Sequence, residues 1–128
     1  MQKIFLIIGT ILGGLSVALG AFGAHGLKKI VSAETVATYQ TGVQYQMYHA
    51  LALILVGLLS EKIASGFINY AGLFFLGGIV LFSGSLYLIV SMYAMNKTVP
   101  TPIGIITPIG GLFFILGWVL LLIGILKK

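Results

Sequence analysis

The chain contains no cysteine, no aspartate and no arginine, and each absence removes a class of function. Without cysteine there can be no disulfide, no thiolate metal site and no cysteine nucleophile. Without arginine the chain lacks the bidentate side chain that recognises phosphates. No basic cluster exceeds two lysines, so we expect no nucleic-acid partner.

Charge of either sign is scarce, because 7% of the 128 residues are charged and 59% are hydrophobic. A soluble domain carries about a quarter charged residues, so this chain could not cover its surface in water. We therefore expect lipid as the solvent, and a single membrane domain over residues 1–128. The acids Glu34 and Glu61 and the seven lysines lie between or outside the apolar runs, where lysines anchor helix ends at headgroups.

Four long apolar segments make up most of the chain. Each reaches about the 20 residues needed to cross a hydrocarbon core about 30 Å thick. In lipid the backbone must satisfy its own hydrogen bonds, and segments of this length do so as helices. We predict an all-α fold, an integral membrane bundle of four transmembrane helices. The expected helices cover residues 4–24, 33–59, 67–92 and 108–126.

The first apolar segment has some features of a secretory signal peptide. Lys3 precedes an apolar run that ends in small residues. From Ile4 to Ala24 this run is about 21 residues long, which exceeds the apolar core of a usual signal peptide. We interpret it as an uncleaved first transmembrane helix.

Two connections contain helix-start signals. Ser32 is expected to cap the second helix, with Glu34 in the first turn, where the helix dipole favours a negative charge. Near the last helix, Thr107 and Pro108 have the pattern of an N-cap and a first helical position, and we favour this interpretation. The alternative is one long helix from Pro102 that is kinked at Pro108.

The lysine distribution predicts an orientation. An even number of spans places both termini on one side of the membrane, together with the loop at residues 60–66. That side carries four lysines and the amino terminus, against three lysines on the other side. By the positive-inside rule, both termini are expected to face the cytoplasm.

Small residues recur every seven positions within the helices, a period that keeps one seam facing a neighbour in a left-handed crossing. Lipid tails are as apolar as leucine, so helix association in a membrane depends on close packing at such seams. A glycine seam can also form a groove for a lipid or ligand, although packing is the interpretation we favour. The glycines predicted to pack helices together are Gly9, Gly13, Gly20, Gly57, Gly77, Gly84, Gly110 and Gly117.

A polar patch opens the second helix. Three- and four-residue spacing places Thr41, Tyr45, Tyr48 and His49 on one face, which should point inward because polar groups are costly against lipid. Polar residues of the other helices fall in the same half of the membrane, and the opposite half is glycine and aliphatic. The candidate ligand-binding residues are His25, Thr41, Gln44, Tyr45, Tyr48, His49, Ser83, Ser85, Tyr87 and Thr107.

This polar half has two interpretations. One is a hydrogen-bond network that specifies helix packing, at roughly 0.6 kcal/mol per interhelical bond. The other is a pocket, open to one side of the membrane, for a small polar or amphipathic ligand. We expect no catalytic residue, because no acid is placed to orient a histidine and no nucleophile motif occurs. We also expect no metal and no cofactor, since His49 lies deeper than His25 and no further histidine or cysteine is present.

Several strings in the chain occur together in one known family. They are GAFGAHGL at 20–27, TGVQYQMYHALAL at 41–53, FSGSLY at 82–87 and TPIGG at 107–111, followed by Gly117 and Trp118. Jointly they resemble the uncharacterised bacterial small inner-membrane proteins related to a small eukaryotic transmembrane protein, a family defined by a domain of unknown function. The resemblance covers essentially the whole chain. It implies a multi-pass protein of the bacterial cell membrane, and it implies no activity, cofactor or catalytic residue.

The residue pattern leaves three functional classes open. The leading hypothesis is a non-enzymatic membrane protein whose polar half-cavity binds a small ligand or lipid headgroup, or docks a partner membrane protein. The alternatives are a dimeric small transporter or channel, and an accessory subunit of a larger membrane complex. Membrane lipids are expected partners, and a second copy of the chain or another membrane protein are candidate ones. A cavity reaching His49 would favour ligand binding, whereas a path past Gly57 would favour transport.

Overall fold

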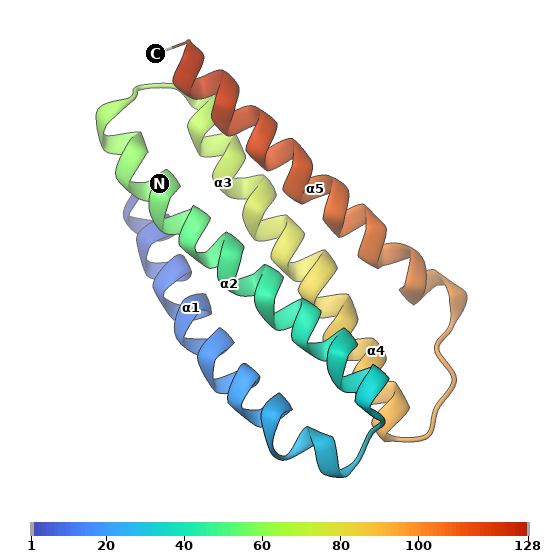
Figure 1. Ribbon diagram of the computed structural model, residues 1–128. Coiled ribbons are helices and arrows are strands. Elements are labelled where there is room, and N and C mark those ends of the chain that lie inside the picture. The colour runs from blue at the N-terminus through green and yellow to red at the C-terminus, as the bar shows by residue number, and fades with distance from the viewer. Residues whose placement is uncertain (1, 128) are drawn as a thin grey trace.

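The computed structural model describes residues 2–127, and every regular element in this range is helical (Figure 1). Four segments are long and apolar enough to cross a membrane, so the all-α prediction with four spans is confirmed. The elements are α1 (Gln2–Ala24), the 3-10 turn η1 (Leu27–Lys29), α2 (Ala33–Lys62), α3 (Gly66–Gly78), the π-helical turn η2 (Ile79–Ser83), α4 (Gly84–Ala94) and α5 (Thr101–Leu126). The third span consists of α3, η2 and α4 in direct succession.

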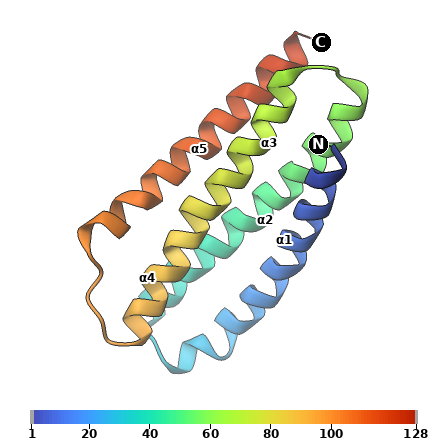
Figure 2. The ribbon, with the colours of Figure 1, turned by 180° about the vertical axis from the view of Figure 1, so that it is seen from behind.

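The spans run alongside one another, with α1 and α5 at opposite edges of the bundle (Figures 1 and 2). The most extensive packing joins α1 to α2 and α3 to α5, while α2 also packs on α3 and α4. The start of α1 and the end of α5 lie at one end of the bundle, together with the connection between α2 and α3. We call this the terminal end, and we call the opposite end, which carries residues 25–32 and 95–100, the η1 end.

Serine side chains define where two of the spans begin. The hydroxyl of Ser32 accepts a hydrogen bond from the Thr35 amide at 3.2 Å, which confirms the predicted N-cap of α2. Ser65 has the same role at α3, where its hydroxyl accepts from the Phe67 amide at 3.2 Å. Each serine satisfies an amide that would otherwise lack a partner at the start of a helix. α2 continues to Lys62, three residues past the predicted end at residue 59.

The favoured prediction for the last span was wrong, because α5 begins at Thr101 and continues through Pro108. Pro102 occupies the first turn, where a missing amide hydrogen has no consequence. Pro108 removes one hydrogen bond within the helix, whereas an unwound segment in lipid would leave many backbone groups without partners. The helix therefore continues, and the hydroxyl of Thr107, expected as a cap, instead contacts Ser85 on α4.

The π-helical turn η2 was not predicted, and it changes which glycines of the third span face a neighbouring helix. A π turn adds about one residue, which rotates everything after it by about 100° around the helix axis. Gly77 precedes this turn and faces α5, where an added Cβ would lie 2.9 Å from the Phe113 ring. Gly84 follows it, and the nearest atom to its added Cβ is the Ile79 carbonyl of its own span, at 3.9 Å. The predicted packing role of Gly84 is therefore not what the structure shows.

The seams of α1 and α2 pack against each other, although not equally along their length. An added Cβ on Gly9 would lie 2.8 Å from the Ala50 carbonyl oxygen, and one on Gly57 would lie 2.8 Å from the Leu6 side chain. Gly20 is less tight, with Val43 at 3.4 Å. An added Cβ on Gly13 would lie 4.0 Å from the sulfur of the flexible Met47 side chain, so Gly13 lies beside α2 without a close contact.

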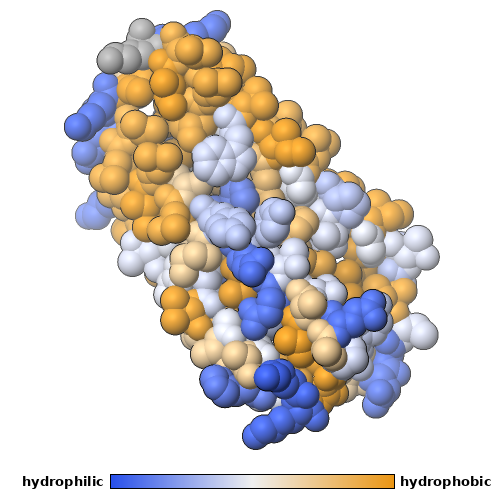
Figure 3. All heavy atoms as spheres, in the orientation of Figure 1, coloured by the Kyte–Doolittle hydropathy of each residue, from blue (hydrophilic) through white to orange (hydrophobic). Residues whose placement is uncertain are grey.

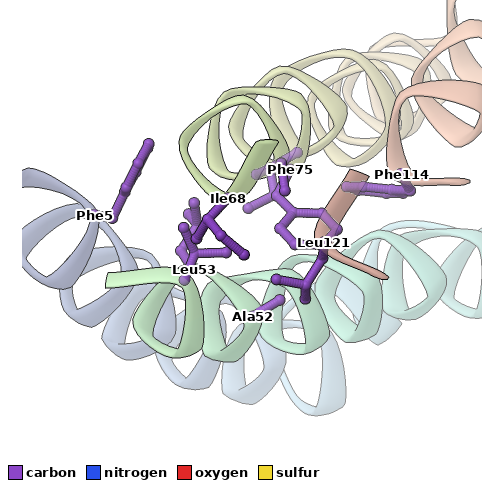
Figure 4. Close-up of a cluster of buried hydrophobic side chains, with 10 residues drawn as sticks. Phe5, Ala52, Leu53, Ile68, Phe75, Phe114 and Leu121 are labelled. Atoms are coloured by element: carbon purple, nitrogen blue, oxygen red, sulfur yellow. The ribbon is translucent and has the colours of Figure 1, made fainter. Parts of the chain in front are cut away.

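On α5 the seven-residue seam is buried at Gly110, Gly117 and Gly124. A Cβ on Gly117 would lie 2.6 Å from the Phe75 ring of α3. Large side chains of the third span therefore fill the space beside Gly117 and Gly124, whereas the backbone of η2 approaches Gly110. The adjoining hydrophobic core draws on α1, α2, the third span and α5, and Figure 4 labels seven of its residues: Phe5, Ala52, Leu53, Ile68, Phe75, Phe114 and Leu121.

Candidate functional site

A groove of about 780 Å³ lies between α2 and α5. These two helices pack on the third span from either side, and the groove is the space left between them. Its walls come from α2, η2 and α5, and Gly111 of α5 forms part of one wall. The aromatic residues that line it are Tyr45, Tyr48, His49, Phe82, Phe114 and Trp118.

His49 lines the groove with 4% of its surface exposed. Its Nδ1 lies 2.7 Å from the Tyr45 carbonyl oxygen, and its Nε2 lies 3.1 Å from the indole Nε1 of Trp118. A carbonyl can only accept a hydrogen bond and an indole can only donate one. His49 is therefore the neutral tautomer with its hydrogen on Nδ1, and its Nε2 accepts from Trp118. The imidazole also stacks on Phe114, with the ring centroids 3.6 Å apart and the planes 8° apart.

Tyr45 and Tyr48 form the α2 rim of the groove. The Tyr45 ring lies 4.7 Å from the Phe82 ring, centroid to centroid, and 5.6 Å from the Tyr48 ring. Tyr48 is 54% exposed and Tyr45 is 38% exposed. Neither phenol oxygen has a hydrogen-bond partner within residues 2–127, and both residues line the groove.

Gln46 connects three helices, although the predicted site contained Gln44 in its place. The Gln46 amide nitrogen donates to the Leu12 carbonyl of α1 at 2.9 Å, and its oxygen accepts from the Tyr87 hydroxyl of α4 at 2.6 Å. Gln46 is 3% exposed, whereas Gln44 is exposed. The Tyr87 hydroxyl thus has its partner inside the bundle, while Gln44 lies on the exposed face of α2.

The predicted serines and Thr107 also make hydrogen bonds between helices. The Ser83 hydroxyl donates to the Gly42 carbonyl of α2 at 2.6 Å. The Ser85 hydroxyl donates to the Phe82 carbonyl at 2.9 Å, so it accepts the hydrogen bond from the Thr107 hydroxyl at 2.6 Å. Each of these three hydroxyl groups therefore has a hydrogen-bond partner inside the protein.

Two further predicted residues lie outside the groove. Thr41 donates to the Ala37 carbonyl of its own helix at 3.1 Å. His25 is exposed, and its Nδ1 lies 3.0 Å from the Ala21 carbonyl oxygen of α1. The prediction placed His25 in one site with His49 because His25 closes the first helix at the same end of the membrane as the polar patch of the second helix. They are separated because His25 follows α1, whereas His49 faces Phe114 and Trp118 of α5, and α1 and α5 lie at opposite edges of the bundle.

The junction of α1 and α2 contains a polar contact that the prediction left out of the site. The Tyr39 hydroxyl donates to the Leu19 carbonyl at 2.7 Å, and the Gln40 amide donates to the Gly20 carbonyl at 3.4 Å.

The polarity of the surface differs between the two ends of the bundle. On the face seen in Figure 3, pale and blue side chains extend from about the middle of the molecule to the η1 end, while the terminal half is mostly orange, with blue side chains at its rim. The polar half of the bundle is therefore present, and hydrogen bonds between helices use most of it.

Similarity to known proteins extends over nearly the whole chain. The family described as "Protein of unknown function (DUF423)" matches residues 19–111. The chain belongs to this family. "UPF0382 membrane protein YwdK" of Bacillus subtilis is 43% identical over 127 residues, which cover 98% of both chains. UPF0382 membrane proteins of Staphylococcus aureus and Staphylococcus saprophyticus are 41% and 42% identical over 126 residues. They match 98% of this chain, and 98% and 99% of their own length.

These relatives establish the membrane as the setting of the fold, since each is named a membrane protein. The resemblance drawn from the sequence strings is confirmed, and it carries no assigned activity. No solved structure matches the chain. Within residues 2–127, histidine and acidic side chains do not gather in groups of three that could hold a metal ion.

Proposed function

We propose that this protein is a non-catalytic membrane protein that holds a lipid-soluble ligand in the groove between α2 and α5. The observation that carries the proposal is the pair of phenol groups of Tyr45 and Tyr48 on the groove rim. Tyr48 lies near the middle of α2, far from the membrane surface where tyrosine is usually found. A hydroxyl without a partner at that depth is costly, so a ligand that accepts its hydrogen bond would be stabilised there.

The walls of the groove indicate the class of ligand. Planar rings gain from offset or edge contacts with aromatic side chains, and this groove offers Phe82, Phe114 and Trp118 for such contacts. Its volume of about 780 Å³ lies within the range typical of small-ligand sites. A flat ring with carbonyl oxygens and an apolar tail, such as a quinone, satisfies both the aromatic walls and the two phenols.

A binding role is also supported by what surrounds the groove. Both ring nitrogens of His49 are engaged, and neither acid of the chain lies in a groove-lining position, so a general acid or base is hard to assign. Gly57, where a transport path would have to pass, packs against Leu6 and Gln2 of α1. The glycine seams pack on neighbouring helices, which weakens the case for an accessory subunit that docks through them.

Trp118 offers a direct test, because it is the one tryptophan of the chain and it lines the groove. The protein in lipid nanodiscs is titrated with a benzoquinone carrying a decyl tail, and Trp118 fluorescence is followed. We expect saturable quenching. In Gly111→Leu the new side chain enters the groove, where an added Cβ lies 3.9 Å from Phe82. Affinity should fall by about tenfold or more, which corresponds to about 1.4 kcal/mol of lost contacts.

The matched control is Gly104→Leu, on the same helix, where nothing lies within 4 Å of an added Cβ. This variant should bind the quinone like the parent protein. Phosphatidylcholine with brominated acyl chains serves as a second quencher. If the brominated lipid and the quinone quench all three proteins alike and without saturation, the groove is ordinary lipid-facing surface and the proposal is wrong.

We infer that the protein lies in the bacterial cell membrane with both termini in the cytoplasm. The bacterial relatives support the location, and the excess of lysines at the terminal end supports the orientation. A green fluorescent protein fused after Lys128 should fluoresce, since it folds in the cytoplasm, and alkaline phosphatase at the same place should be inactive. Insertion of each reporter at residues 95–100 should give the opposite pair of results. The reversed pattern would contradict the orientation.

A further inference from the structure

A second pocket of about 450 Å³ lies at the η1 end, on the α1 side of the bundle. It is separate from the groove between α2 and α5, with which it shares no lining residue. Its walls come from α1, η1, α2 and α4. Six residues that define it are Leu19, Phe22, Leu27, Tyr39, Val90 and Met95.

The interior of this pocket is apolar. Two of its hydroxyl groups are already engaged, since Tyr39 donates to the Leu19 carbonyl at 2.7 Å and Ser91 donates to the Tyr87 carbonyl at 2.8 Å. Leu27 is 3% exposed and holds η1 against the bundle. From Tyr87 to Ala94, which both line the pocket from α4, the helix rises about 10 Å at 1.5 Å per residue, which is the length of several methylene groups. The slot suits a hydrocarbon chain better than a polar solute.

Three lysines lie close in sequence to residues that line the pocket. Lys28 and Lys29 are exposed and lie in η1, directly after the lining residue Leu27. Lys97 is exposed and follows the lining residue Met95 by two positions. Of the two acids in the chain, Glu34 lies at this end and Glu61 at the other. The η1 end therefore carries three lysines against one carboxylate, at the level where headgroups would lie.

From this arrangement we propose that the pocket is a binding site for one anionic phospholipid. An acyl chain lies in the apolar slot between α1 and α4, and the phosphate meets the ammonium groups of Lys28 and Lys29. Charge complementarity selects the headgroup, because each lysine near an anionic lipid surface contributes a favourable interaction. The proposal does not depend on the ligand of the first groove.

Native mass spectrometry from mild detergent tests the site, with phosphatidylglycerol and phosphatidylcholine added separately. Phosphatidylglycerol should bind the parent protein as one tight adduct, and phosphatidylcholine should bind more weakly. The double variant Lys28→Gln/Lys29→Gln should bind phosphatidylglycerol about 25-fold less tightly, or about fivefold for each lysine. The control Lys3→Gln/Lys62→Gln removes the same charge from the terminal end and should change the affinity by less than about twofold.

A third variant tests the slot itself. Ala94 lines the pocket, and Ala94→Phe should fill it and remove the tight adduct, while the Trp118 fluorescence spectrum in the other groove stays unchanged as a check on folding. Three results would overturn the proposal. Phosphatidylcholine could bind as tightly as phosphatidylglycerol, both lysine pairs could weaken binding equally, or Ala94→Phe could keep the tight adduct.

Discussion

Replacing Gly110 with alanine is expected to destabilise the protein more than any other single added methyl group. The new Cβ would lie 2.7 Å from the Phe82 Cα and 2.8 Å from the Leu81 carbonyl carbon, and these are backbone atoms of η2 that cannot rotate away. Overpacking of this kind costs about 1–3 kcal/mol. The measurement is unfolding by sodium dodecyl sulfate in mixed micelles, followed by Trp118 fluorescence.

The control for this prediction is Gly14→Ala, because nothing lies within 4 Å of an added Cβ at Gly14. Alanine favours the helix over glycine by roughly 0.5–1 kcal/mol, so this variant should be as stable as the parent or slightly more stable. Equal stability of Gly110→Ala and Gly14→Ala would show that α5 does not approach η2 closely. Gly13→Leu, which the seven-residue pattern also singles out, should have a small effect, because the nearest atom to an added Cβ is the sulfur of the flexible Met47 side chain, at 4.0 Å.

Replacing Gln46 with leucine is the second large effect that we expect. Leucine removes the hydrogen bonds to the Leu12 carbonyl and from the Tyr87 hydroxyl, and it leaves the hydroxyl of the half-buried Tyr87 without its partner. Such an orphaned group costs about 1–3 kcal/mol, and the same detergent unfolding assay measures it. Gln44→Leu makes the identical chemical change two residues away on the exposed face, where leucine should be neutral or stabilising in lipid.

A double-mutant cycle separates the network from general effects of burial. Tyr87→Phe removes the hydroxyl that donates to Gln46. If the two residues are coupled as the structure indicates, the double variant Gln46→Leu/Tyr87→Phe should lose less stability than the sum of the two single variants. Strict additivity, or a similar loss in Gln44→Leu and Gln46→Leu, would contradict the role of Gln46 as a link between α1, α2 and α4.

The four spans were predictable because the rule behind them is local. A chain in lipid must satisfy its backbone hydrogen bonds within each segment, so length and apolarity identify a span without knowledge of its neighbours. The cap at Ser32 is local in the same way. The start of α5 could not be predicted from a local rule of this kind. Proline interrupts a helix in water, whereas the cost of unwinding α5 at Pro108 depends on the surrounding lipid.

The inward faces of the helices were harder to predict. In a soluble protein the apolar stripe marks the buried side of a helix, but in lipid both sides are apolar and this contrast is lost. Gln44 and Gln46 lie two positions apart on the same helix and therefore point in different directions, and the sequence alone could not show which of them is buried. The π turn η2 has no sequence signal that we recognise, although it decides that Gly77 meets α5 and Gly84 does not.

The groove depended on tertiary structure in a similar way. Tyr45, Tyr48 and His49 were predicted to share one face of α2, and all three line the groove. Phe82, Phe114 and Trp118 were not predicted, because aromatic residues in transmembrane helices usually indicate packing or contact with lipid. Trp118 was present in the family-like strings, but its hydrogen bond to His49 joins residues that are 69 positions apart, and no spacing rule reaches that far.

The hydrogen bonds of the first three spans have a consequence for how the protein is made. Tyr39 joins α2 to α1, Gln46 joins α2 to α1 and α4, and Ser83 joins η2 to α2, all without α5. These three spans can therefore form their mutual hydrogen bonds while the ribosome is still synthesising the last one. α5 then completes the protein by seating Gly110 against η2, and the groove comes into existence with that final step.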